Sequence, residues 1–155
     1  MSGAKSPVGI AWRVALVGIC LVPYVASYTM PALHFHLLKG EERIMKGSEL
    51  AMMGPLALLH FNVAWLANLL FLQGLALMLG GLWRSAAVFA ALAALFGLHT
   101  LQFYTQTIDA SLNMGRDSPM LLTQLEPGFY LWMGSFGLVL IVSLACWLRD
   151  RKLRT

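Results

Sequence analysis

The chain has 155 residues, of which 59% are hydrophobic, and a formal net charge of +4. Such a composition, concentrated in long apolar stretches, is typical of an integral membrane protein and leaves too little polar chain to bury a separate soluble core. The positive charge does not indicate nucleic-acid binding, because a short basic tail beside a membrane forms no extended groove.

Four apolar stretches are each long enough to cross a bilayer, which takes about 20 mostly apolar residues in a helix. They are Val8–Leu33, Met52–Leu79, Ser85–Thr105 and Gly128–Leu148. The first is interpreted as a retained span rather than a cleaved signal peptide, because its apolar run continues past Ser27. The sequence therefore predicts an all-α fold: one four-span transmembrane domain over residues 1–155, packed as a four-helix bundle.

The charged residues divide between the two ends of these stretches. One side carries seven basic residues and one acid, for a net charge of +6; these are Lys5, Arg13, Arg84, Arg149, Arg151, Lys152 and Arg154, with Asp150. The other side has a net charge of −2 and holds Lys39, Arg43, Lys46 and Arg116 with Glu41, Glu42, Glu49, Asp109, Asp117 and Glu126. The positive-inside rule then places both termini in the cytoplasm.

The segments between the stretches are predicted to be loops. In the first outer loop, residues 34–50, the fragment Glu41–Met45 is expected to form a brief interfacial helix. The second outer loop, residues 106–127, has a turn near Pro119 and leads into Phe129, Tyr130 and Trp132, which are typical of an interfacial aromatic belt.

Small residues indicate where helices pack closely. The third stretch contains Ala86, Ala90, Ala93 and Gly97, spaced so that a neighbouring backbone can approach. This stretch is expected to be central in the bundle. Gly134 and Gly137 predict a similar close-contact patch on the last helix.

Polar residues inside the stretches are the candidates for a site, because lipid makes them costly. Depth counting about the Gly80–Gly81 turn places them in a layer near the outer surface, with Asn68 closer to mid-membrane. The predicted structural polar cluster comprises His60, Asn62, Asn68, His99 and Gln102. Asn68 is expected to form a hydrogen bond between helices.

An alternative interpretation of the same layer is a haem b or transition-metal site with His60 and His99 as ligands, since imidazole suits both. His34 and His36 add little, because on a helix they would point about 200° apart, although on a strand they would share a face. The favoured interpretation has no cofactor and no metal. Cys20 and Cys146 are interpreted as small apolar fillers.

Three short segments carry a resemblance to known proteins. These are Lys46-Gly47-Ser48-Glu49-Leu50 leading into Gly54, then Ala64-Trp65-Leu66-Ala67-Asn68, then Pro127-Gly128-Phe129-Tyr130-Leu131-Trp132. Their order resembles a group of small bacterial inner-membrane tetraspan proteins of uncharacterised function. The resemblance implies a multi-pass protein of the bacterial inner membrane and brings no activity with it.

No catalytic motif is present in the sequence, and a non-enzymatic function is therefore favoured. The expected partners are the lipid bilayer and another membrane protein or a second copy of the chain. Two forms are considered: an accessory subunit of an inner-membrane complex, and an immunity-type protein that blocks a membrane-acting toxin. The competing class is the haem- or metal-binding redox protein.

Overall fold

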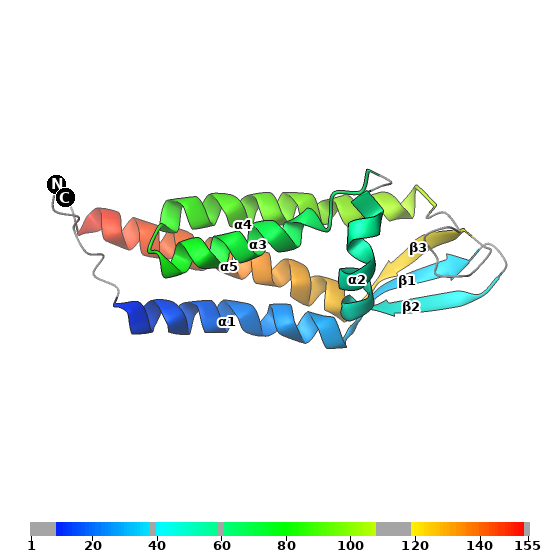
Figure 1. The fold of residues 1–155 in the computed structure, drawn as a ribbon, viewed down its shortest axis with the longest axis horizontal. Helices are drawn as coiled ribbons and strands as arrows, with labels where there is room; N and C mark the ends of the chain where they lie inside the picture. The colour runs from blue at the N-terminus through cyan, green and yellow to red at the C-terminus, as the bar shows by residue number, and fades with distance from the viewer. Residues whose placement is uncertain (1–8, 38–39, 59–60, 108–118, 154–155) are drawn as a thin grey trace.

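A computed structural model describes residues 9–37, 40–58, 61–107 and 119–153. Most of these residues are helical, and the longer helices run along the long axis of the molecule (Figure 1). In chain order the elements are α1 (Ile10–Thr29), β1 (Pro31–Leu37), β2 (Glu42–Lys46), α2 (Gly47–Ala57), α3 (Leu66–Leu79), α4 (Trp83–Leu98), the 3₁₀ helix η2 (His99–Tyr104), β3 (Met120–Leu125) and α5 (Pro127–Lys152).

Three of the helical segments are long and apolar enough to cross a membrane, by length and composition. They are α1, α4 continued through η2 to Tyr104, and α5. The remaining long-axis helix, α3, is apolar but has only 14 residues. The chain is thus a candidate multi-pass membrane protein with three full-length spans among its described residues, rather than the four that were predicted.

The predicted second span is wrong as a continuous helix. α2 ends at Ala57 and α3 begins at Leu66. Two features between them oppose a helix: Phe61 has a φ of 58°, in the left-handed region, and Oδ1 of Asn62 accepts a hydrogen bond from the backbone N–H of Ala64 at 3.0 Å. A side chain that bonds its own backbone two residues on offers the chain a turn in place of a helix.

The helices pack around a core in which small residues on α4 face large ones on its neighbours. Ala86, Ala90 and Ala93 are fully buried, and they share the core with Phe71 of α3 and Phe136 of α5. The small-residue face predicted for the third stretch therefore lies in the bundle.

The prediction of a second close-contact patch, on the last helix, is wrong. No described atom outside the local helix lies within 4 Å of a Cβ built on Gly134 or on Gly137. These two glycines face away from the neighbouring helices, whereas Gly97 of α4 lies against Met133 and Phe136 of α5.

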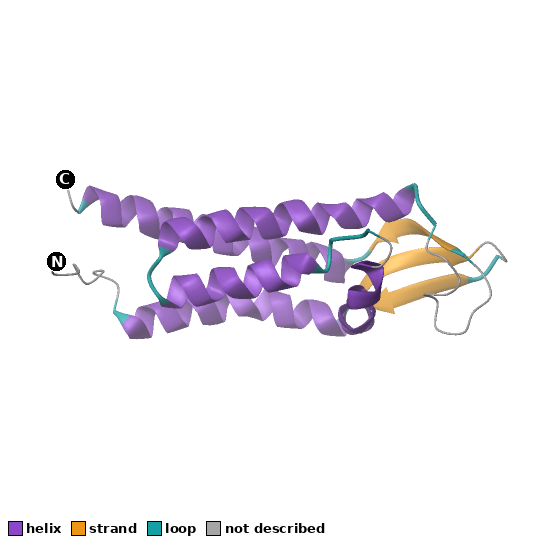
Figure 2. Ribbon diagram, turned by 45° about the horizontal axis from the view of Figure 1, so that its top comes forward, coloured by secondary structure: helices purple, strands orange, loops and turns teal. Residues whose placement is uncertain are grey.

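A three-stranded antiparallel sheet in the order β2-β1-β3 caps one end of the bundle (Figure 2), so the all-α prediction is wrong in this part. The predicted interfacial helix at 41–45 is likewise wrong, because these residues belong mainly to β2. Alternation explains the central strand: Leu33, Phe35 and Leu37 are buried, while His34 and His36 lie on the opposite face.

The sheet packs onto the bundle through its own apolar cluster. The buried members are Leu33, Phe35, Leu37, Met45, Met120, Leu122 and Phe129. Phe129 lies in the first turn of α5 and so ties the sheet to the helices. β1 directly follows α1 and β3 directly precedes α5, which fixes the sheet at the end of the bundle.

Candidate functional site

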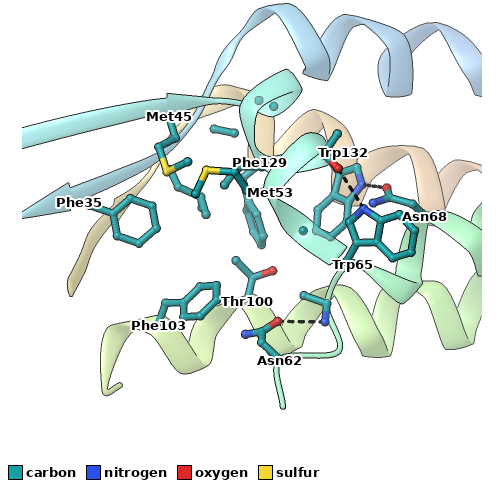
Figure 3. A pocket seen from close by; sticks show the side chains of 18 of the residues that line it. Phe35, Met45, Met53, Asn62, Trp65, Asn68, Thr100, Phe103, Phe129 and Trp132 are labelled. Carbon is teal, nitrogen blue, oxygen red and sulfur yellow. Dashed lines mark hydrogen bonds between the residues drawn. The ribbon is translucent and has the colours of Figure 1, made fainter. Parts of the chain in front are cut away.

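A cavity of about 160 Å³ lies where the bundle meets the sheet (Figure 3). The strands contribute Phe35 and Met45, and Met53 comes from α2. Phe103 comes from η2, and Phe129 and Trp132 come from α5. Most of the wall is apolar and aromatic, as in typical small-molecule sites.

Two glycines allow α2 to lie across the ends of the other helices. Gly47 sits so close to the backbone carbonyl of Ser27 that a side chain would overlap it, and its N–H donates to the carbonyl of Met30 at 3.1 Å. Gly54 faces the indole ring of Trp65, which occupies the space that a Cβ would take. The indole N–H of Trp65 donates to the carbonyl of Ala51 at 3.2 Å, so this contact fixes α2 against the start of α3.

Two buried polar residues of the cavity wall come from the break between α2 and α3 and from η2. Asn62 is 2% exposed, and its side-chain N–H donates to the carbonyl of His99 at 3.4 Å. Thr100 is 5% exposed and turns its hydroxyl toward the open space of the cavity, near Asn62 (Figure 3). Sequence reasoning missed Thr100, because a threonine in an apolar stretch gives no signal of its own.

Asn68 joins three helices through one atom. Its Oδ1 accepts a hydrogen bond from the indole N–H of Trp132 at 2.8 Å and another from the hydroxyl of Tyr24 at 3.1 Å. Tyr24 is in turn hydrogen-bonded to the hydroxyl of Tyr28 at 2.8 Å. Asn68 thus forms hydrogen bonds between helices, with partners on α1 and α5.

The other predicted site residues are only partly brought together. Asn62 contacts the backbone of His99, as the pairing across the hairpin predicts. The side-chain amide of Gln102 donates to Oε1 of Gln106. Nδ1 of His99 and Oε1 of Gln102 are buried, and neither has a hydrogen-bond partner among the described residues.

His60 lies outside the described residues, so its pairing with His99 stays a prediction. Among the residues that the structure describes, no three His, Cys, Asp or Glu side chains are grouped to hold a metal ion. Cys20 and Cys146 are free thiols in the core of the bundle.

The outer face of the sheet carries charged groups around His34. Nε2 of His34 lies 3.4 Å from a carboxylate oxygen of Glu42, and Nδ1 lies 3.7 Å from one of Glu126. On the other face Arg43 lies 3.7 Å from Glu49 of α2. The two contacts of His34 join the central strand to β2 and to the start of α5, and the Arg43–Glu49 contact joins β2 to α2.

Comparison of the chain with protein-family models, with curated proteins and with solved structures finds no significant match. The resemblance to small tetraspan membrane proteins therefore stays a prediction.

Proposed function

We propose that this chain is a non-enzymatic membrane protein that acts by binding a protein partner at its sheet-bearing end. The first form is an accessory subunit of a bacterial inner-membrane complex. An immunity-type protein is the second form. In both forms the sheet lies on the outer side of the membrane and the termini lie in the cytoplasm.

The observation that carries the proposal is the composition of the edge strand β3. Its sequence, Met120 to Leu125, contains neither a charged residue nor a proline. β3 pairs with β1 along one edge, and no described strand pairs with its other edge. An unpaired edge without charge or proline is a template to which an extended segment of another chain can add.

The opposite edge of the sheet, strand β2, is charged, which supports strand addition at β3. β2 carries Glu42, Arg43 and Lys46 within five residues. Charged side chains on an edge strand discourage pairing with another chain. The two edges are therefore unequal, and strand addition is expected at β3 rather than at β2.

The test is photocrosslinking in cells, with a benzophenone amino acid placed at one sheet position at a time. Gln124 of β3 and Ile44 of β2 form a matched pair, because both side chains are exposed on the outer face and each lies opposite His34. We expect a protein adduct of one defined mass from position 124 and little from position 44. Equal adducts at both positions, or none at position 124, would contradict strand addition at β3.

The competing proposal is a haem or metal protein with His60 and His99 as ligands. One observation favours it: Nδ1 of His99 is buried and has no partner among the described residues. A Soret band, or iron, copper or zinc bound in stoichiometric amount to the purified protein and lost in His99→Gln, would replace the partner-binding proposal with this one.

A further inference from the structure

We propose that the cavity between α2, η2 and the sheet binds the uncharged, ring-sized head of a lipid-soluble amphiphile, the class to which alkylated quinones and phenols belong. The inference goes beyond partner binding and does not depend on it. Its basis is the size of the cavity, the chemistry of its wall and its position beside exposed apolar residues.

The size of the cavity limits the ligand to about one ring. An engineered apolar cavity of about 150 Å³ in a soluble protein holds one benzene molecule. The cavity here has a volume of about 160 Å³. It therefore accommodates a six-membered ring with small substituents and is too small for a phospholipid head group.

The wall excludes a charged ligand. No described residue that lines the cavity is charged, and none is a histidine. Placing an ion in such surroundings costs several kcal/mol or more unless a partner neutralises it. A carboxylate, phosphate or ammonium group is thus disfavoured, whereas a carbonyl or hydroxyl group on a ring is not.

The wall also offers what a ring with an oxygen substituent needs. Trp65 in the turn before α3, Phe103 of η2 and Phe129 of α5 present aromatic surface to the cavity (Figure 3). Aromatic rings prefer stacked or edge-to-face contacts with one another, which favours a ring over a flexible alkyl chain. The hydroxyl of Thr100 both donates and accepts, so it can bond to either a carbonyl or a hydroxyl of the ligand.

The position of α2 provides access from the bilayer. α2 lies across the direction of the long helices (Figure 1), the orientation of a helix in the plane of a membrane surface. Its outward side is apolar: Met52 is 77% exposed and Leu56 is 44% exposed, and Phe61 just after it is 86% exposed. Leu56 also lines the cavity, so one wall is shared between the cavity and the lipid-facing surface.

The experiment compares two probes on the purified full chain in lipid nanodiscs. The first probe, 2-decyl-1,4-benzoquinone, carries a decyl chain on a ring with two carbonyl groups and no other substituent, and decylbenzene has the same chain on a ring without oxygen. A ligand that binds only the folded protein raises the melting temperature in a saturable way. We expect a saturable rise with decylbenzoquinone and a weaker effect with decylbenzene. An equal effect of both probes, or no saturable rise with decylbenzoquinone, would overturn the proposal.

A matched pair of variants locates the site. Thr100→Val removes the hydroxyl and keeps the shape, whereas Thr29→Val makes the same change at an exposed position outside the cavity. Thr100→Val is expected to raise the half-saturating concentration of decylbenzoquinone about threefold to tenfold, the effect of losing one hydrogen bond. Thr29→Val is expected to leave that concentration unchanged. The same half-saturating concentration in both variants would contradict the site, and the comparison of probes on the parent protein holds even if Thr100→Val does not fold.

Discussion

A single amide oxygen, Oδ1 of Asn68, joins α1, α3 and α5. It accepts from the hydroxyl of Tyr24 and from the indole N–H of Trp132. Polar groups in hydrocarbon need partners within the protein, so these two bonds favour one packing arrangement of the three helices.

Replacing Asn68 by leucine should therefore destabilise the fold. The change keeps the approximate volume but removes the acceptor of two hydrogen bonds. Interhelical hydrogen bonds in membranes contribute about 0.6 kcal/mol each on average, so a loss of about 1–2 kcal/mol is expected. Thermal unfolding of the purified protein in detergent measures it.

The matched control for Asn68→Leu is Gln73→Leu on the same helix, because Gln73 is exposed. This control should melt within about 0.5 kcal/mol of the parent, as most surface substitutions do. If Asn68→Leu is as stable as Gln73→Leu, the hydrogen bonds of Asn68 do not hold the helices together.

At the level of single residues, the sequence predicted that Asn68 bonds between helices, but it did not predict which residues are its partners. A lone amide in an apolar stretch needs a partner, and this alone indicates a bond between helices. Depth counting, however, compares only the two helices of one hairpin, whereas the partners of Asn68 lie on α1 and α5. Trp132 was interpreted as part of an interfacial belt, and its indole N–H in fact points into the bundle.

At the level of elements, the outer end differs most from the prediction. The helical stretch predicted over Met52–Leu79 is interrupted because Asn62 bonds its own backbone, a feature that an average of apolar residues cannot detect. The alternation of Leu33, His34, Phe35, His36 and Leu37 was a usable signal for a strand. The prediction divided it between the end of the first apolar stretch, at Leu33, and the outer loop over residues 34–50. The pairing with β3 joins residues about 90 apart in the chain.

The docking of α2 provides a test at this level. A methyl group at position 54 would overlap the ring of Trp65, so Gly54→Ala should push α2 away from the start of α3. Overpacking of this kind typically costs about 1–3 kcal/mol. The melting temperature should fall. The fluorescence of Trp65, obtained by subtracting the spectrum of a Trp65→Phe protein, should also change.

Gly18→Ala is the matched control for Gly54→Ala. No described atom outside its local helix lies within 4 Å of a Cβ built at Gly18, and this residue lies inside α1. Alanine there should leave the stability unchanged or raise it by about 0.4–1 kcal/mol. Equal stability of the two variants would mean that α2 is not held against Trp65.

At the level of the whole molecule, the two ends differ in charge. The beginning of α1, the α3–α4 turn and the end of α5 lie together at the end opposite the sheet (Figure 1). Arg13 donates to the carbonyl of Leu79 at 3.2 Å there, and three basic residues lie in the last turn of α5. Cations are favourable at helix C-termini, so these residues stabilise the helix ends as well as indicate orientation.

The charge difference predicts that the end with the termini faces the cytoplasm and the sheet faces outward. Single cysteines at Glu42 in β2 and at Lys152 in α5 test this, because both positions are exposed while Cys20 and Cys146 are buried. In intact cells an impermeant maleimide should label Glu42→Cys and leave Lys152→Cys unlabelled, and opening the cells should make Lys152→Cys reactive.

The parent protein measures the background from Cys20 and Cys146, which should be low in both conditions. Labelling of Lys152→Cys with protection of Glu42→Cys in intact cells would invert the orientation. The sheet and its uncharged edge β3 would then face the cytoplasm, and a partner would have to be sought there. The orientation of the protein in the membrane therefore decides on which side strand addition at β3 can take place.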